Sequence, residues 1–467
     1  MTSFVRSALL ISLTIVFLFA CRKNEFTDSP DALLTTTVDS LHFDTVFTTT
    51  GSFTQAFKIV NDNDKGVRIN SVRLMGGNAS PFRINVDGTA GPQVTDIEIR
   101  DNDSTYVFVT VKIDPNADNL PFVVRDSIEI AYNGNRQLVQ LEAWGQNAHF
   151  FRAREITSNE VWENDLPYVI LGGIAVDTSV TLTINKGCRI YMHADAPFIV
   201  QGTLRVNGEK WDSTRVVFTG DRLDEPYRDF PAAHPGIIFT PSSVNSVLNY
   251  AIIKNAYQGI VADRPATNSN PKVTLNEVVV DNAYETGVLG YNSSISGTNV
   301  LVSNCGRNLY LVNGGNYRFT HLTAVSYSNN YVQHKEPVLI ATDFINQTDA
   351  PRPLTAVFRN AIFWAEGGLV DNEVVVSTRN PAASSVTFEG VLWKVKAAPT
   401  ASTTVIGTPL IQAPVFDSIN VSRRFFNFRL KEGSPGVNAG INAGVTLDLD
   451  GAPRPVGLPD LGAYERQ

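Results

Sequence analysis

Residues 218–237, FTGDRLDEPYRDFPAAHPGI, gather an unusual number of side chains that could do chemistry between short apolar segments. The four carboxylates belong to Asp221, Asp224, Glu225 and Asp229. Clustered carboxylate oxygens are ligands that Ca²⁺ prefers, but these acids lack EF-hand spacing, and Arg222 and Arg228 would compete for them. We therefore favour a surface loop, in which the arginines offset the acids and Tyr227 and Phe230 pack on the body, over a calcium site.

Polysaccharide chemistry would need charged side chains that converge around a sugar chain. Hydrolysis uses two facing carboxylates, and elimination from an acidic sugar needs a positioned base. The candidates along the chain are Lys254, Asp263, Asp281, Arg307 and His321. Only a tertiary structure could bring them together, and His334-Lys335-Glu336 falls in an expected loop. His234 is also expected to be a loop histidine rather than a base, so no catalytic residue is assigned.

Four tyrosines could serve a binding function without catalysis. Tyr257, Tyr284, Tyr291 and Tyr310 recur near the turns of successive short strands. Their rings could stack on sugars, although tyrosines in such positions often pack between neighbouring strands instead. We take them as candidate ligand contacts for a glycan.

The elements that must position these residues are β-strands, because no long helical period of apolar residues appears. From residue 168 the chain shows strands of four or five residues, each closed by Gly, Asn or Asp. Asn255, Asn282 and Asn304 end similar strands 27 and 22 residues apart, and Asn360 marks a fainter copy. Asparagine tolerates the left-handed backbone of a sharp bend, so these residues are expected to be architectural.

This pattern of short strands and turns resembles the sequences of right-handed parallel β-helices, in which "LTI..G..I" and "V…G.L.V" patterns mark the first coils. Residues 430–467 resemble the closing signature of β-helix proteins of the choice-of-anchor Q group. The matching residues are Ser434-Pro435, Ala439-Gly440, Asp448, Asp450-Gly451, Arg454, Asp460 and Gly462-Ala463-Tyr464-Glu465. The match departs from the group at Asn438, where an acid is usual. The resemblance implies a Bacteroidetes-type β-helix lipoprotein, with a terminal cap in which Asp and Arg pair, and it implies no reaction.

Residues 38–147 alternate apolar and polar positions, with Phe53, Phe57 and Ile59 on one face and Val67, Ile69 and Val72 on the next strand. The dipeptide Asn133-Gly134 predicts a hairpin. This block resembles the immunoglobulin-like sandwiches of bacterial surface proteins.

The N-terminus has a basic residue, Arg6, before an apolar run from Ala8 to Ala20 that stops at Cys21. The run is too short to span a bilayer of about 30 Å and predicts a signal peptide. Leu18-Phe19-Ala20 resembles a lipobox, which implies lipidation at Cys21 and anchoring to the membrane. The other cysteines, Cys188 and Cys305, show no metal spacing and are expected to be separate buried thiols.

The 467-residue chain has a formal net charge of −8, and no basic stripe that would suit nucleic acid. The sequence predicts an all-β protein: an immunoglobulin-like β-sandwich followed by a single-stranded right-handed parallel β-helix, a solenoid of the pectate-lyase type. The expected division is listed along the chain: signal peptide 1–20, tether 21–37, sandwich 38–147, linker 148–167 and β-helix with C-terminal cap 168–467.

We expect a monomeric cell-envelope lipoprotein, on the outer membrane and exposed at the surface, that acts as a non-catalytic binding or scaffold module for glycans. Two alternatives stay open: a polysaccharide lyase or glycoside hydrolase acting on the β-helix face, and a structural or adhesion protein with no glycan ligand. No cofactor is expected, with calcium as the alternative given above.

Overall fold

The computed structural model describes residues 25–48, 51–114, 122–346 and 348–467. The chain divides into two compact units, with the boundary between Asn147 and Ala148. The described residues are all-β apart from three single-turn 3-10 helices, η1 (Gly77–Ala79), η2 (Tyr227–Asp229) and η3 (Pro381–Ala383). The described residues include no helix with both the length and the apolar character that a membrane crossing requires.

The first unit consists of two β-sheets. One has the order β1-β5-β10-β11-β3, with β8 also paired to β5, and the other has the order β2-β4-β9-β6-β7. The strands of the first sheet are β1 (Phe26–Thr27), β3 (Ser40–Phe47), β5 (Gly66–Leu74), β8 (Gln93–Ile99), β10 (Phe122–Tyr132) and β11 (Asn135–Gln146). Those of the second are β2 (Thr35–Thr36), β4 (Gln55–Asn61), β6 (Phe82–Val86), β7 (Thr89–Gly91) and β9 (Asp103–Val111).

Both sheets contribute to one apolar core, as the alternation of residue types predicts. The predicted inward residues are buried, or in the case of Phe53 packed against the core: Phe53, Phe57, Ile59, Val67, Ile69 and Val72. The predicted hairpin joins β10 to β11, where Asn133 and Gly134 have φ values of 45° and 79°. Two successive positive φ values are the geometry of the tight turn that Asn-Gly favours.

The expected tether is partly built into this unit. Within residues 25–37, β1 pairs with β5, β2 pairs with β4, and Leu34 is buried. The Leu34 amide donates to the Tyr132 hydroxyl at 3.0 Å. The prediction of a free tether was therefore wrong for these residues, because their apolar side chains complete the core edge.

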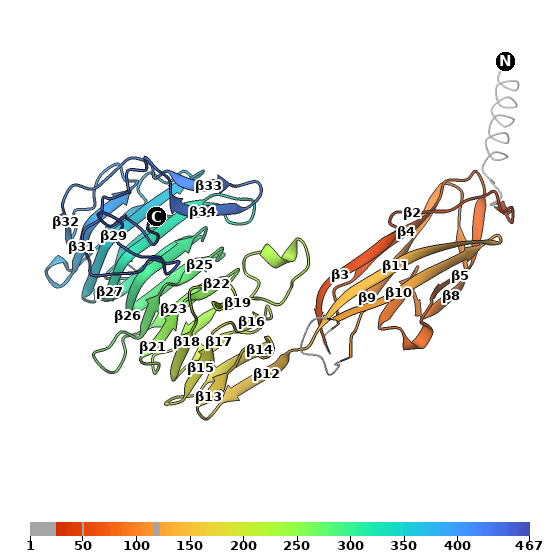
Figure 1. Ribbon diagram of the computed structural model, residues 1–467, viewed down its shortest axis with the longest axis horizontal. Coiled ribbons are helices and arrows are strands. Elements are labelled where there is room, and N and C mark those ends of the chain that lie inside the picture. Colours follow the sequence, from red (N-terminus) through yellow and green to blue (C-terminus); the bar gives the residue numbers. More distant parts are fainter. Residues whose placement is uncertain (1–24, 49–50, 115–121, 347) are drawn as a thin grey trace, which may run out of the picture. The chain divides into compact units, whose positions relative to one another are not determined.

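The second unit contains one 21-stranded sheet, in which every strand-to-strand pairing is parallel. Figure 1 shows these strands stacked from β12 and β13 (gold) to β31 and β32 (blue). The early strands are β12 (His149–Ile156), β13 (Glu160–Trp162), β14 (Tyr168–Val176), β15 (Thr181–Asn185), β16 (Arg189–Met192), β17 (Phe198–Val200), β18 (Thr203–Asn207), β19 (Val216–Gly220), β20 (Ile237–Phe239), β21 (Ser246–Asn249), β22 (Ala251–Lys254), β23 (Gln258–Asp263), β24 (Val273–Asn276) and β25 (Val279–Asp281).

The later strands are β26 (Thr286–Ser303), β27 (Arg307–Tyr327), β28 (Leu339–Thr342), β29 (Leu354–Glu366), β30 (Val374–Ser377), β31 (Ser385–Trp393) and β32 (Thr403–Ile406). Among them, β26, β27 and β29 are longer because they run around corners without interruption, whereas β28, β30 and β32 are short. A separate antiparallel hairpin, β33 (Phe416–Asn420) and β34 (Phe425–Leu430), follows.

The short strands pair with the strand three places further along the chain, so the second unit is a solenoid-like stack with three faces. The β15 face continues through β18, β21 and β24, and the β16 face through β19, β22 and β25. The β17 face continues through β20 and β23 to the start of β26. Each coil covers its neighbour, as in repeat proteins generally.

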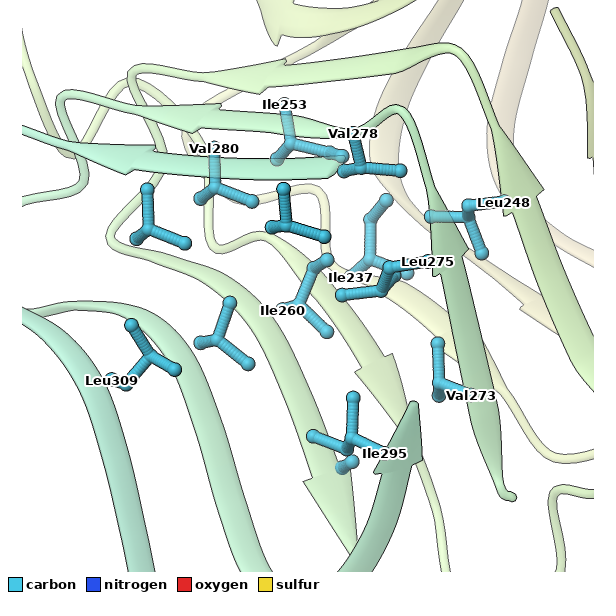
Figure 2. Close-up of a cluster of buried hydrophobic side chains, with 14 of the residues drawn as sticks. Ile237, Leu248, Ile253, Ile260, Val273, Leu275, Val278, Val280, Ile295 and Leu309 are labelled. Carbon is cyan, nitrogen blue, oxygen red and sulfur yellow. The ribbon is translucent and has the colours of Figure 1, made fainter. Parts of the chain in front are cut away.

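The interior of the stack is filled by alternate side chains from all three faces. Figure 2 shows Ile237 and Ile260 from the β17 face, Leu248 and Leu275 from the β15 face, and Ile253 and Val280 from the β16 face, all in one cluster. All six are fully buried. Buried parallel strands carry such short apolar runs because both of their faces are covered.

The segment expected to be a linker belongs to this stack. β12 pairs with β14, β13 pairs with β15, and Trp162 lies in the core against Tyr168 at a ring-centroid distance of 4.3 Å. The linker prediction was wrong because residues 148–167 form the coil that covers the first end of the stack.

The predicted asparagine corners are present. Asn255, Asn282 and Asn304 have φ values of 64°, 56° and 53°, and the Asn282 amide donates to Asn255 Oδ1 at 2.8 Å. Asn360 is also left-handed, but its register places it beside His321 at a different corner, so it is not a fourth member of this series.

The C-terminal segment, residues 413–467, lies along the side of the stack, not over its end. Leu449 and Leu461 pack with Leu301, Ile362 and Leu392, which point outward from the continuation of the β16 face. The segment's hydrogen bonds reach coils that lie far apart in the stack. Arg215 donates to the Leu449 carbonyl at 2.6 Å, and the Asn360 carbonyl accepts from the Gly462 amide at 2.9 Å. The expected terminal cap is therefore a lateral cover.

The buried charges of this segment pair differently from the expectation. Arg454 Nε lies 3.0 Å from Glu465 Oε2, and both side chains are fully buried. Asp448 and Asp460 instead accept backbone amides, while Asp450 pairs with Arg429 at 2.7 Å. The buried Arg454 thus pairs with a glutamate, and the expected pairing of Asp with Arg occurs at the exposed Arg429.

Candidate functional site

An open groove of about 370 Å³ lies on the second unit, where the corners before β26 and β27 meet the loop of residues 328–338. Its lining combines aromatic, cationic and acidic side chains: Tyr284, Glu285, Gly306, Arg307, Asn330, Tyr331, Val332, Gln333, Lys335 and Glu336. Ligand sites commonly combine ring surface with a few polar groups that set orientation. A larger hollow of about 650 Å³ around Glu163, Lys186 and Glu209 has no aromatic lining residue.

Two of the four predicted tyrosines form a pair at this groove. The rings of Tyr257 and Tyr284 are stacked, with centroids 5.9 Å apart and planes inclined by 26°. Both tyrosines are exposed, at 44% and 52% of their full surface. Because they precede strands of successive coils, the rigid stack sets their spacing, and together they present apolar ring surface to solvent.

Charged side chains surround Arg307 in the groove. Arg307 Nη1 lies 3.9 Å from Glu285 Oε1, and Nη2 lies 3.7 Å from Glu336 Oε1. The Glu285 carboxylate also raises the pKa of the neighbouring Tyr257 phenol. The distances to both carboxylates exceed hydrogen-bond length, so the guanidinium is held between two acids without a close bond to either.

Of the four predicted tyrosines only Tyr284 lines the groove itself, and Tyr257 adjoins it through the stacked ring of Tyr284. Tyr310 sits on the outward side of β27 between Leu289 and Ile340, and Arg307 lies over its ring at 4.9 Å from the centroid. Tyr291 lies further along β26, in register with Asp263 and Val312. The structure therefore joins Tyr257 and Tyr284, links Tyr310 to them through Arg307, and leaves Tyr291 apart.

The unusual stretch of residues 218–237 supports the groove from outside. Phe230 packs against Tyr331 at a ring-centroid distance of 4.7 Å, and Tyr227 packs on Phe230 at 5.0 Å. The stretch therefore stabilises the loop of residues 328–338, which carries Tyr331. Tyr227 itself remains 44% exposed.

Each of the four acids of this stretch has a basic side chain as its partner. Asp221 pairs with His193 at 2.7 Å, Asp224 with Arg222 at 2.6 Å, Glu225 with Arg228, and Asp229 with Arg424 at 3.0 Å. Among the residues that the structure describes, no three His, Cys, Asp or Glu side chains gather as metal ligands. The acids thus have the ion-pairing arrangement that we favoured over calcium.

His234 and His334 each join two parts of the structure through a contact of Nε2. His234 is buried, its Nε2 donates to the Lys254 carbonyl at 3.0 Å, and burial lowers its pKa to about 4. His234 is thus part of the stack rather than of an exposed loop. His334 Nε2 lies 3.0 Å from the buried Glu373 carboxylate, which ties the loop of residues 328–338 to the coil of β30.

The charged candidates for lyase chemistry do not converge on one point. Lys254 and Asp281 are register neighbours and share a smaller cavity, while Arg307 lies in the groove. Asp263 lies 3.7 Å from Arg264 on another corner. His321 is buried below the C-terminal segment, and burial lowers its pKa to about 3.

Several residues that line the groove could not be found from the sequence. Tyr331, Lys335 and Glu336 belong to a loop without strand periodicity, and no spacing relates them to Tyr284. Their position depends on the contacts of Phe230 and His334. Cys21, the predicted lipidation site, lies outside the described residues. Cys188 and Cys305 are free, buried thiols as predicted.

Comparisons with known proteins add little to this geometry. No family model matches the chain, and no curated protein matches it. Among solved structures, a family 123 glycoside hydrolase from Clostridium perfringens, described with glycolipid glycan hydrolysis, aligns at a TM-score of 0.18 and 11% identity. The alignment covers 27% of this chain and 26% of that enzyme, so the chain matches about a quarter of the enzyme's length. A likeness of this size carries no argument about fold or function.

Proposed function

We propose that this protein is a cell-envelope lipoprotein that binds glycans without altering them, and that its ligand lies in the Tyr284 groove. The observation that carries the proposal is the exposed, stacked pair of Tyr257 and Tyr284, of which Tyr284 lines a groove with polar side chains. Aromatic rings present apolar area at low entropic cost, and they commonly anchor ligands of mixed polarity.

The finer architecture belongs to the same proposal. The two-sheet first unit fits an immunoglobulin-like sandwich that serves as a spacer, and the three-faced parallel stack fits a right-handed β-helix. The motifs of residues 430–467 support a place in the choice-of-anchor Q group. Attachment through Cys21, outer-membrane location, surface exposure and a monomeric state are parts of the proposal that rest on the sequence.

The groove supports binding better than catalysis. Arg307 is engaged by two carboxylates, and Lys254 and Asp281 lie in a different cavity. A base and an acid facing each other across one sugar bond would be needed for hydrolysis or elimination. A polysaccharide lyase or hydrolase is therefore the first rival, and a purely structural role is the second.

The test is binding of the purified protein to a panel of neutral and acidic polysaccharides by isothermal titration calorimetry, with Tyr284→Ala and Tyr257→Ala as variants. Loss of one stacking ring is expected to weaken binding by about tenfold, which corresponds to about 1.4 kcal/mol. Tyr106→Ala is the matched control, because Tyr106 is an exposed tyrosine stacked on Phe108 in the first unit.

The same samples distinguish the rivals. Unsaturated uronic products absorbing near 235 nm, or new reducing ends, would show catalysis and overturn the non-catalytic proposal. No binding to any polymer of the panel would instead favour the structural role. Equal loss of affinity in the Tyr106 control would contradict the groove as the binding site.

A further inference from the structure

A second cavity lies beside the groove, at the corner formed by Asn255, Asn282 and Asn304. We call it the corner pocket; its volume is about 130 Å³. Four parts of the chain enclose it: the asparagine corners, the 3-10 turn η2, the turn between β33 and β34, and the loop of residues 328–338. The side chains used below are Asp229, Lys254, Asp281, Asn329, Arg423 and Arg424.

The acids of the corner pocket already have donors within the protein. Asp281 Oδ1 accepts from the Ser303 hydroxyl at 2.6 Å and from the Asn304 amide at 3.3 Å. Asp229 Oδ2 accepts from Arg424 Nη2 at 3.0 Å. Neither carboxylate therefore needs a cation from outside.

Two of the cations of the corner pocket have fewer partners within the protein than the acids have. Within the described part of the chain, neither the Lys254 amine nor the Arg423 guanidinium takes part in an ion pair or a side-chain hydrogen bond. Lys254 is half-buried between coils, next to Asp281 in the register, whereas Arg423 is exposed at the hairpin turn. Together with Arg424 they give three cationic groups against two acids. Burial raises the pKa of Asp281, and the neighbouring Lys254 charge opposes this rise.

Amide donors add to these cations. Asn329 Oδ1 accepts the Tyr331 and Val332 amides, both at 2.8 Å, so its Nδ2 is the group left to face the pocket. Arginine, lysine and amide N–H groups around one cavity form the donor set that recognises carboxylates and sulfates.

One loop lines both the corner pocket and the groove. Asn329 lines the corner pocket, and the next residues, Asn330 and Tyr331, line the groove. Arg424 lies over the Tyr331 ring at 5.0 Å from its centroid. The corner pocket therefore adjoins the groove at residues 329–331.

We propose that the corner pocket receives an oxyanion, a carboxylate or a sulfate, of a glycan lying in the Tyr284 groove, so that the ligand is an acidic polysaccharide. The inference rests on the proposed glycan-binding function and names its substrate class. It assigns a role to Lys254 and Arg423 as the charged contacts.

The test compares polygalacturonate, a sulfated galactan and a neutral galactan by isothermal titration calorimetry with the purified protein. The wild type is expected to bind an acidic polymer at least about tenfold more tightly than the neutral one, and to lose this preference as NaCl is raised. Preference for polygalacturonate would identify the carboxylate as the anion, and preference for the sulfated galactan would identify the sulfate.

Lys254→Gln and Arg423→Gln are each expected to weaken acidic-polymer binding by about tenfold, with neutral-polymer binding unchanged. Lys396→Gln is the control, because Lys396 is an exposed lysine paired with Asp371 away from both cavities. Arg423 is exposed, so its variant should fold even if the Lys254 variant does not, and a thermal melt checks both.

Two failures are distinguishable. Glycan binding that depends on Tyr284 but shows no acidic preference, or no response to Lys254→Gln and Arg423→Gln, would overturn the inference and leave the proposed function standing. Absence of binding to all three polymers would overturn both.

Discussion

At the scale of single residues, His234 shows how the stack imposes a protonation state. Its ring is buried, and its Nε2–H faces the Lys254 carbonyl, which can only accept. The carbonyl sets the neutral tautomer with the proton on Nε2, and burial disfavours the imidazolium, lowering the pKa to about 4. The same coil carries Lys254, so this histidine helps to place a wall of the corner pocket.

The pH dependence of folding follows from this burial. An unfolded histidine titrates near pH 6.5, so the unfolded chain takes up a proton between about pH 6.5 and 4 that folded His234 excludes. Protonation of this histidine in the unfolded chain therefore lowers the free energy of unfolding as pH falls through that window, by about 2 kcal/mol between pH 6.5 and pH 5. His234→Gln should remove this part, measured by urea unfolding at both pH values; an unchanged pH difference would contradict the prediction.

At the scale of elements, the asparagine corners combine two stabilising effects. Each corner needs a positive φ, which costs an ordinary residue about 1–2 kcal/mol and asparagine less. The Asn282 amide also donates to Asn255 Oδ1 at 2.8 Å and to the Asp229 carbonyl at 3.0 Å. The corner thus joins neighbouring coils to η2, which forms a wall of the corner pocket.

Two substitutions separate these effects. Asn282→Gly keeps the left-handed backbone but loses the amide bonds, and should lower the free energy of unfolding by about 2 kcal/mol. Asn282→Ala should cost about 1 kcal/mol more, because alanine also strains the backbone. Asn276→Ala is the control, since Asn276 makes an amide bond to Asn249 from a regular strand, and should cost less than about 1 kcal/mol. Equal losses for the glycine and alanine variants of Asn282 would show that the backbone term is negligible.

At the scale of the second unit as a whole, the C-terminal segment protects an apolar sheet surface. Leu301, Val325, Ile362, Trp364 and Leu392 are outward residues that this segment buries. An uncovered face of this kind would be prone to association. The hairpin of the same segment also supplies Arg423 and Arg424, so cover and corner pocket are built together.

Removal of residues 413–467 should therefore expose this surface, increase binding of the dye ANS and cause self-association in analytical ultracentrifugation. Glu465→Gln is a milder change, because it removes the carboxylate that pairs with the buried Arg454, at a cost of about 3–5 kcal/mol. It should make the C-terminal segment sensitive to limited proteolysis. A truncated protein that stays monomeric and ANS-negative would show that this cover is dispensable.

The sequence predicted those features that depend on neighbouring residues. Alternation at Phe57 and Ile59 predicts their burial, Asn133-Gly134 predicts the hairpin, and Asn255 predicts a left-handed corner, because side-chain direction and backbone φ are local properties. The sequence misplaced residues 148–167, since a coil at the end of a stack and a linker have similar composition. It also grouped Asn360 with the other corners, although register with His321 places it elsewhere.

The sequence by itself determined the all-β class, the succession of short parallel strands and the buried thiols. It also singled out Tyr257 and Tyr284 as candidate ligand contacts. Only the tertiary structure decided which tyrosines meet, that Arg307 stands between two acids, and that Asp229 and Arg424 close one cavity although 195 residues separate them. The reason is physical: strand patterns follow the chain, whereas grooves form where loops of unrelated sequence pack against the same coil.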